Sequence, residues 1–426
     1  MTIYIVKKFV QKFPDPKMNK PARNDQMIKI VIIGEGIYAN TFAILDYSNL
    51  HDPCFFAMKE LKPNVVWKEN CQQLVFQKSY HPAIARYVSY FDAREPDESP
   101  LLISDFYSRG SLHDYIRLYR QKAKEFTFLQ IEHILSIAYG IAKGLDYLHS
   151  NKIVHGNLKP SNILLDSSLK PHLSDFMFVK QNADKNEINF VINYTSPELL
   201  KGMTEKKPLN PTPKSDIYSF GMILYELLTG QVPFVEFNSF ELLRDRIING
   251  HRPSTDSVFF RFVPLIMSCW NENIDSRPTA LQLATNIHDI AKTMKAQPSF
   301  FTYAKSFLQI DKKSESKQTD RKQVDGVSTV VMKAAELNES HLAMYILGIV
   351  QLYGVKGVKN EPLANPEPNS AIKLLLVASD SFVLAMNVCC ELYNDNVFSK
   401  IDGFDFEEMK KTLENLNTRK SKHLAI

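Results

Sequence analysis

The hydrophobic pattern of the chain changes its period near residue 100, and this change constrains the fold most. Before it, the β-branched and apolar runs 27–33, 41–47, 54–61 and 84–91 are typical of strands. After it, residues 129–149 place apolar side chains at helical spacing, which predicts an amphipathic helix. A strand-rich part followed by a helix-rich part predicts an α+β fold.

Two further segments carry a helical signal. Residues 65–80 place Trp67, Cys71 and Leu74 on one face at helical spacing, so we expect a helix there, inserted among the strands. Residues 215–229 are apolar almost throughout, which predicts a buried helix that ends at Gly230.

Composition excludes several classes of protein. The chain has 426 residues, of which 44% are hydrophobic, so it can build a sizeable core and is not mostly disordered. Its 51 basic and 47 acidic side chains leave a net charge of +4, too small to predict nucleic acid as a partner. Its five cysteines form no CxxC pair, and no apolar run is long enough to span a membrane. We therefore expect a cytoplasmic protein.

The ends of the chain differ from its middle. Residues 1–26 are basic and contain several prolines, so we expect a flexible arm. Residues 296–326 change in character, and within them 312–322 is almost wholly polar and mixed in charge, so we expect a linker. Beyond the linker, residues 327–426 contain the pattern Ala-Met at 343–344 and again at 385–386, which suggests repeated helical hairpins.

The first chemical signal lies between the predicted strands. Gly34 and Gly36 would let a backbone fold closely over phosphate groups, although a plain β-turn is the simpler interpretation of these glycines alone. Lys59 ends a predicted strand and could reach phosphates as a point charge, whereas the simpler interpretation is a solvated surface lysine.

A second signal lies between the helical segments. The stretch 155–162 contains His155, Asn157 and Asn162, and Asp175 follows it after a short apolar run. The side-chain oxygens of Asn162 and Asp175 are hard donors of the kind that Mg²⁺ prefers.

These motifs, taken with the blocks 216–234 and 269–278, resemble a eukaryotic protein kinase domain. The resemblance covers 27–295 and is closest to the tyrosine-kinase-like group, although the stretch 158–162 is similar to the serine/threonine type of catalytic loop. It implies a bilobal fold with a small antiparallel-sheet lobe that carries one helix, a large helical lobe, and ATP and Mg²⁺ as cofactors.

The resemblance also implies roles for particular residues. The positions that match the family's nucleotide site, metal site and catalytic loop are Gly34 and Gly36 (phosphate loop), Lys59 (phosphates), Ala57 and Leu164 (either side of adenine), Ser104 (gatekeeper), Phe106 and Tyr107 (hinge), Asn162 and Asp175 (Mg²⁺), Asn157 (base position) and Lys159 (substrate loop). The positions that match the family's structural residues are Glu198 with Arg277 (buried ion pair), Asp216 (anchor of the catalytic loop), and Phe76, Tyr87, His155 and Phe176 (hydrophobic spine).

Several of these positions depart from the family pattern. Asn157 replaces the aspartate that accepts the substrate proton, and an amide cannot act as a general base at neutral pH. Gln72 stands where the glutamate partner of the phosphate-binding lysine is expected. Gly156 replaces the arginine that pairs with an activation-segment phosphate, so activation by phosphorylation is not expected. Met177 and Val191 replace a glycine and a threonine.

The C-terminal region is similar to Sel-one-like repeats, which implies an all-α region that binds a protein partner. The two cysteines at 389–390 replace the usual leucine and glycine of such a repeat, and one of them is expected in the core.

Three functions remain open from the sequence. The first is a pseudokinase that binds Mg–ATP, is catalytically impaired and serves as a scaffold or switch. The second is an active serine/threonine protein kinase that transfers the γ-phosphate to protein hydroxyls. The third is a protein-interaction module that binds no nucleotide.

Overall fold

The computed structural model describes most of the first 310 residues and short parts of the remainder. The described residues are 11–12, 27–46, 54–76, 81–93, 98–122, 131–180, 191–205, 210–310, 341–353, 355–356 and 362–364, with 371, 374–375, 378, 385 and 388–389. The chain forms two compact units. The sheet unit comprises residues 1–63, 87–110 and 320–426, and the helical unit comprises 64–86 and 111–319.

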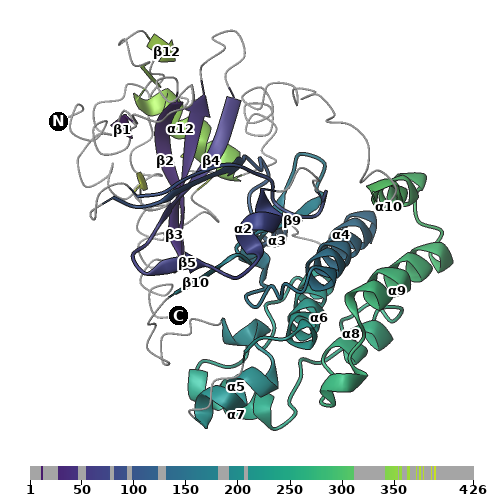
Figure 1. Ribbon diagram of the computed structural model, residues 1–426. Helices are drawn as coiled ribbons and strands as arrows, with labels where there is room; N and C mark the ends of the chain where they lie inside the picture. The colour runs from purple at the N-terminus through teal and green to yellow at the C-terminus, as the bar shows by residue number, and fades with distance from the viewer. Residues whose placement is uncertain are drawn as a thin grey trace, which may run out of the picture. The chain divides into compact units, whose positions relative to one another are not determined.

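The sheet unit is built on an antiparallel sheet with strand order β1-β2-β3-β4-β7-β6 (Figure 1). Its strands are β1 (Gln11–Lys12), β2 (Met27–Glu35), β3 (Ala39–Asp46), β4 (Cys54–Leu61), β6 (Tyr87–Phe91) and β7 (Leu101–Asp105). The strands predicted at 27–33, 41–47 and 54–61 are therefore confirmed, since their β-branched and apolar side chains suit a buried sheet.

The two faces of this sheet differ in character. Ile44, Met58 and Ile103 gather in one buried cluster, because alternate residues of a strand point to the same face. Ala43 and Ala57, which precede Ile44 and Met58 and so point to the opposite face, are buried as well. Both faces of the central strands are thus covered, which is unlike a sheet with one solvated face.

Both ends of the chain add to the sheet unit. The arm expected at 1–26 contributes β1, whose Gln11 and Lys12 pair with β2, so this part of the arm is ordered by strand pairing; its other residues lie outside the described ones. Helix α12 (His341–Tyr353) contacts β2 and has a buried segment from Leu342 to Ile346.

The C-terminal region is not all-α, contrary to the expectation. Strands β11 (Val355–Lys356) and β12 (Pro362–Ala364) follow α12 and pair with each other. Helical packing is still present, because a Cβ atom on Gly348 would lie 2.8 Å from Leu375. The cysteine expected in the core is Cys389, which is buried, while most of 365–426 lies outside the described residues.

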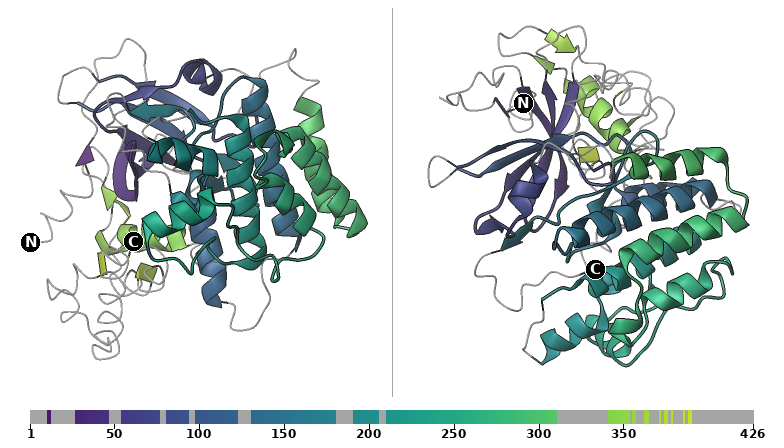
Figure 2. Two further views of the ribbon diagram at one scale, coloured as in Figure 1. Left: turned by 90° about the horizontal axis from the view of Figure 1, so that it is seen from below. Right: turned by 45° about the vertical axis from the view of Figure 1, so that its right-hand side comes forward.

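The helical unit is built mainly from helices. They include α3 (Leu112–Lys122), α4 (Ile131–Ser150), α5 (Pro197–Thr204), α6 (Pro213–Thr229), α7 (Phe240–Ile248), α8 (Val263–Cys269), α9 (Ala280–Thr293) and α10 (Pro298–Ile310). The short strands are β8 (Ile163–Leu165), which pairs with β9 (Pro171–Leu173), and β5 (Val65–Trp67), which pairs with β10 (Phe178–Lys180). Figure 2 shows α10, α4 and α9 side by side.

Helix α6 is the buried helix that the sequence predicts. Thr212 and Ser215 form a capping box at its start, and Pro213 occupies its first turn. Gly230 adopts the left-handed conformation at its end, with φ of 66°. None of the described helices has the length and apolar character needed to span a bilayer.

Residues 296–326, expected as a linker, begin with helix α10 instead. Phe300, Tyr303 and Phe307 of α10 are buried and meet Tyr139 of α4 edge to face, at centroid distances from 5.6 to 6.5 Å. These aromatic contacts explain why the first half of the segment is ordered. The remainder, 311–326, lies outside the described residues.

The helix expected at 65–80 is much shorter than its periodicity indicates. Val65–Trp67 form strand β5, and only α2 (Cys71–Val75) is helical. The β-branched pair at 65–66 favours an extended backbone, and β10 provides the strand with which it pairs. The segment also belongs to the helical unit, whereas the resemblance places its helix with the small sheet.

The buried ion pair that the resemblance implies is present. Arg277 donates to both carboxylate oxygens of Glu198, at 2.8 and 3.0 Å, and its side chain is 1% exposed. The same guanidinium donates to the carbonyl oxygens of Asn271 and Lys214. It therefore ties α5 to the start of α6 and to the turn before α9.

We expect Arg277→Met to lower the free energy of unfolding by about 3–5 kcal/mol, because it leaves the Glu198 carboxylate without its cation. Urea unfolding would measure the change. The matched control is Lys292→Met, which removes the cation of an exposed pair with Asp289 and should cost at most about 1 kcal/mol. Equal losses in the two variants would contradict the prediction.

Candidate functional site

The candidate phosphate-binding residues of the sheet unit lie in register across three strands. Gly34 of β2 pairs with Thr41 of β3, and Thr41 pairs with Lys59 of β4. Directly opposite residues of neighbouring strands have side chains on the same face. Gly34, near the end of β2, and Lys59 therefore occupy positions on one face of the sheet. The Lys59 side chain is 7% exposed.

The candidate adenine residues lie farther along the same sheet. Ala57 of β4 pairs with Ser104 of β7, which places these two small side chains opposite each other. Phe106 and Tyr107 follow β7 and are both buried, and the ring of Phe106 lies 5.8 Å from that of Phe55. The expected gatekeeper and hinge positions are thus held rigidly at the end of a central strand.

Packing does not explain the glycines of the β2–β3 hairpin. A Cβ atom on Gly34 would meet Thr41 at 3.6 Å, and one on Gly36 would meet the Ala39 carbonyl oxygen at 3.4 Å, which are ordinary contacts. Among the described residues, neither glycine has the positive φ that only glycine adopts easily. The hairpin therefore carries no side chain at these two positions although ordinary contacts would tolerate one, and a bare backbone suits a close approach by phosphate groups.

In the helical unit, Asp216 organises the catalytic loop. Its carboxylate accepts hydrogen bonds from the backbone N–H groups of His155 and Gly156, at 2.9 and 2.8 Å, and contacts His149 Nε2 at 2.9 Å. Burial raises the pKa of Asp216, but the hydrogen bond and charge of His149 outweigh burial, and the pKa lies below its ordinary value. The anchor is therefore a carboxylate, as the resemblance implies.

The candidate metal ligand Asn162 is fixed by its neighbours. Its side-chain nitrogen Nδ2 donates to the main-chain carbonyl oxygen of Asn157 at 2.8 Å. Its main-chain carbonyl oxygen accepts from the hydroxyl and the N–H group of Ser174. Because the amide nitrogen is used in this bond, the side-chain oxygen Oδ1 is the atom that can coordinate a cation.

The second candidate ligand, Asp175, has an unusual backbone conformation. Its φ is 62°, a region that costs a non-glycine residue free energy and is concentrated at functional sites. Among the described residues, no three His, Cys, Asp or Glu side chains gather into a metal site. A magnesium ion held by Asn162 and Asp175 would take its other ligands from phosphate and water, as Mg²⁺ commonly does.

His155 and Phe176 pack behind these ligands, as the resemblance implies. Their ring centroids are 6.1 Å apart, and both side chains are fully buried. Burial lowers the pKa of His155 to about 4, despite the charge of Asp216, so the ring is neutral and serves packing. Phe76 packs on Trp67 and stays 38% exposed, which is not the buried spine position that the resemblance implies.

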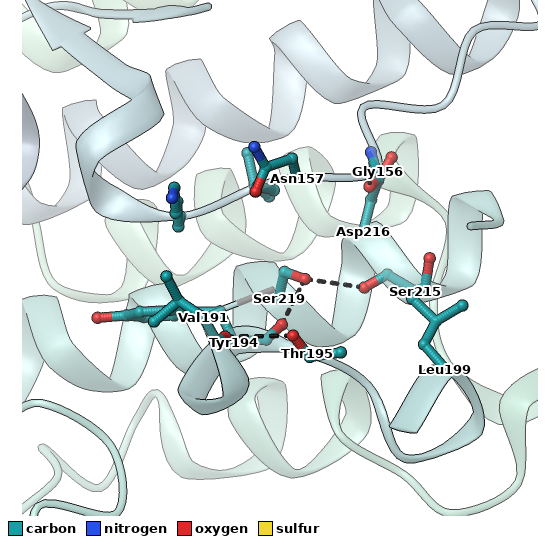
Figure 3. Close-up of a pocket in the computed structure, with 11 residues that line it drawn as sticks. Gly156, Asn157, Val191, Tyr194, Thr195, Leu199, Ser215, Asp216 and Ser219 are labelled. Atoms are coloured by element: carbon teal, nitrogen blue, oxygen red, sulfur yellow. Dashed lines mark hydrogen bonds between the residues drawn. The ribbon is translucent and has the colours of Figure 1, made fainter. Parts of the chain in front are cut away.

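Asn157 and Lys159 line one pocket with the end of the activation segment. Figure 3 shows Asn157 and Gly156 on one side of this pocket, and Val191, Tyr194 and Thr195 across it. Burial lowers the pKa of Lys159, and the charge of Asp175 opposes that shift. The pocket offers an amide and an ammonium to a hydroxyl-bearing group, but its lining contains no carboxylate except the Asp216 anchor.

The other candidate residues are placed differently. Leu164 lies in β8, where it pairs with His172 and bridges to Ser111. Gln72 lies on the exposed side of α2, next to the buried Cys71.

Two contacts near the pocket were not identified from the sequence. The Tyr194 hydroxyl donates to Glu226 at 2.5 Å, and the Ser219 hydroxyl donates to the Tyr194 carbonyl oxygen at 2.7 Å. Both fix the end of the activation segment to α6. A glutamate inside the otherwise apolar run 215–229 is the sequence signal that could have indicated a buried partner.

Comparison with known proteins agrees with this geometry. The family model of the protein kinase domain matches residues 27–287, more than half of the chain. A probable serine/threonine-protein kinase of Dictyostelium discoideum is 32% identical over 46% of this chain and 14% of its own length. The serine/threonine-protein kinase VIK of Arabidopsis thaliana is 31% identical over 51% of this chain and 49% of its own length.

The STRUBBELIG-RECEPTOR FAMILY 5 protein of Arabidopsis thaliana is 37% identical over 37% of this chain and 21% of its own length. The chain therefore spans half or less of the length of these relatives.

The Tyr194–Glu226 contact predicts a pH dependence. Burial raises the pKa of Glu226 from 4.5 to about 7, so the fold favours the protonated form. The stability that this preference contributes is present below pH 4.5 and is lost as the pH rises through about 7. At one pKa unit per 1.36 kcal/mol, the loss is at most about 3 kcal/mol.

We expect the melting temperature to fall from pH 5 to pH 8 more steeply in the wild type than in Glu226→Gln, which keeps an acceptor for Tyr194 but does not titrate. Thermal unfolding at several pH values would measure the slopes. The exposed Glu236→Gln serves as control and should follow the wild type. Parallel curves for wild type and Glu226→Gln would contradict the pKa shift.

Proposed function

The chain belongs to the protein kinase family, and we propose that it is a pseudokinase that binds Mg–ATP and transfers phosphate poorly or not at all. The observation that carries the proposal is Asn157, which lines the substrate-side pocket at the base position of the family. Its amide can hydrogen-bond a hydroxyl group but has no basic site to remove the proton at neutral pH.

Nucleotide binding is supported by the glycines of the hairpin, by Lys59 and by two oxygen donors. Gly34 and Gly36 leave the hairpin backbone without side chains, Lys59 would hold the phosphates, and Asn162 Oδ1 and Asp175 would hold Mg²⁺. Ala57, Ser104, Phe106, Tyr107 and Leu164 would surround adenine. Bound Mg–ATP supplies the phosphoryl group, and the residues of the chain bind and orient it.

The residue at the position of the family's conserved glutamate also supports impairment. Gln72 occupies this position, and it lies on the exposed side of the five-residue helix α2. An exposed amide on a short helix cannot give the charge-assisted hydrogen bond that aligns the family's lysine.

The finer features of the proposal rest on sequence resemblance. We assign the domain, at 27–295, to the tyrosine-kinase-like group because the blocks 216–234 and 269–278 resemble that group. Residues 327–426 form Sel-one-like repeats that bind a protein partner, which makes the protein a cytoplasmic scaffold or switch. Small-residue packing at Gly348 supports helical hairpins in this region.

The second candidate is an active serine/threonine protein kinase. It is favoured by the names of the relatives, which include serine/threonine-protein kinases, and by the presence of Lys59, Asn162 and Asp175. Positioning and metal binding alone preserve part of the rate of an enzyme that has lost its base. The third candidate, a module that binds no nucleotide, is favoured by Gln72 alone.

Phosphotransfer from labelled ATP tests the first candidate against the second. We expect wild-type incorporation, with Mg²⁺ or Mn²⁺, to be indistinguishable from that of Lys59→Met. Asn157→Asp should raise the rate, because general base catalysis contributes typically 10²–10⁴-fold. A robust wild-type rate that is lost in Lys59→Met and does not rise in Asn157→Asp would identify a working kinase and contradict the proposal.

Nucleotide binding is tested by the melting temperature in the presence of Mg–ATP. A ligand at about 100 times its Kd adds roughly 2.7 kcal/mol, which for a domain of this size raises the melting temperature by on the order of 5–10 °C. Gly34→Ala should reduce this increase with little effect on the melting temperature without nucleotide, because its Cβ makes only ordinary contacts. The control Lys62→Met should respond to Mg–ATP like the wild type. An unchanged wild-type melting temperature would favour the third candidate.

A further inference from the structure

Lys68 is a half-buried lysine that the sequence patterns did not single out. It lies between strand β5 and helix α2, and its ammonium nitrogen donates to the carbonyl oxygen of His155 at 2.8 Å. A second carbonyl oxygen, that of Val154, lies at 3.4 Å. The side chain thus connects the segment before α2 to the backbone of the catalytic loop.

The backbone around Lys68 makes a second connection. Its N–H group donates to the carbonyl oxygen of Met177 at 2.8 Å. The adjoining strand β5 pairs with β10, with Trp67 opposite Phe178, and the rings of these two residues lie 4.7 Å apart. One short segment therefore holds the catalytic loop through a side chain and the first strand of the activation segment through its backbone.

The ammonium group of Lys68 lies beside Gly156, the position where the family's arginine is missing. A Cβ atom on Gly156 would lie 3.5 Å from Lys68 Nζ and 3.2 Å from Pro211. Gly156 also has a φ of 74°, which a side chain rarely adopts. Because Gly156 has no side chain, the Lys68 ammonium group can lie beside its backbone.

The charges around Lys68 suit a cation held at this place. Burial lowers the pKa of Lys68, and the nearby negative charge of Asp216 opposes this shift. Asp216 also anchors the backbone N–H groups of His155 and Gly156. The carboxylate and the ammonium thus act on the same peptide groups of the loop, one as acceptor and the other as donor.

The activation segment offers no exposed hydroxyl group for phosphorylation. Between 178 and 196, the only hydroxyl-bearing residues are Tyr194, Thr195 and Ser196. All three are buried, and the hydroxyls of Tyr194 and Thr195 donate to Glu226 and to the Val191 carbonyl oxygen. Phosphorylation could not order this segment in the way usual for the family. The segment has no exposed hydroxyl group to receive a phosphate, and the catalytic loop has no arginine to bind one.

We propose that Lys68 is a positioning residue that permanently ties the catalytic loop to the activation segment, in place of the phosphate-dependent contact made through a loop arginine. The arrangement of these two segments is then independent of phosphorylation. This inference rests on the proposed function in one respect: the catalytic loop and the activation segment are taken to form the nucleotide and substrate site of a kinase domain.

Amide hydrogen exchange of the full-length protein tests the proposal. Lys68→Met keeps the length of the side chain but removes its donors and its charge. We expect exchange in residues 154–157 and 178–180 to speed up roughly tenfold or more, because the His155 carbonyl oxygen loses its partner. Lys68→Arg, which retains a cationic donor, should remain closer to the wild type in both segments.

The matched control is Lys201→Met, which removes an exposed lysine of the same unit and should leave both segments unchanged. Wild-type exchange rates in Lys68→Met would overturn the proposal. Equal acceleration in Lys68→Met and Lys68→Arg would overturn it as well, because a role in packing alone would not distinguish the two.

A second measurement needs no variant. Exchange in the same two segments is compared before and after treatment of the wild-type protein with a phosphatase. We expect identical rates, and a gain in exchange after dephosphorylation would overturn the proposal. The melting temperature with Mg–ATP, measured on the same samples, reports on the proposed function separately: a protein without a nucleotide response but with the expected exchange pattern would contradict nucleotide binding and leave the role of Lys68 supported.

Discussion

The arrangement of the helical unit depends on the buried carboxylate of Asp216. It accepts two backbone N–H groups of the catalytic loop and contacts His149 of α4, so α6, α4 and the loop meet at one charged group. A carboxylate that is fully buried is stable only with such partners. Because the backbone at His155 and Gly156 is fixed, the positions of Asn157 and of Asn162, which bonds to the Asn157 carbonyl oxygen, follow from it.

The fixed loop presents its groups to a pocket in which the chemistry of the family is altered. An amide stands at the base position, and the far side of the pocket is fixed to α6 through Tyr194, Ser219 and the protonated Glu226. The contacts that hold the loop and the pocket in place are therefore present, whereas an amide replaces the carboxylate that accepts a proton in the family. The impaired phosphotransfer that we propose follows from this amide, which cannot accept a proton at neutral pH.

The segment 65–75 illustrates how tertiary contacts override local periodicity. Its apolar spacing predicts a helix through residue 80. Residues 65–67 pair with β10 instead, because strand pairing stabilises them more than an isolated helical turn would. Lys68 then finds carbonyl oxygens of a loop that is far away in sequence. Tertiary contacts also explain α10, since Phe300, Tyr303 and Phe307, in the first half of the segment expected as a linker, pack on Tyr139.

The sequence by itself determined the strands at 27–33, 41–47 and 54–61, the helix predicted at 129–149 and the end of α6 at Gly230. Its resemblance to the kinase family implied the Glu198–Arg277 ion pair. These features depend on local periodicity and capping, or on motifs whose spacing is specific. Only the tertiary structure decided that 65–67 form a strand, that Glu226 is a buried acid paired with Tyr194, and that a lysine from outside the catalytic loop lies beside Gly156. Each of these is a contact between residues distant in sequence, and a buried charge or a short strand finds its partner only once the chain is folded.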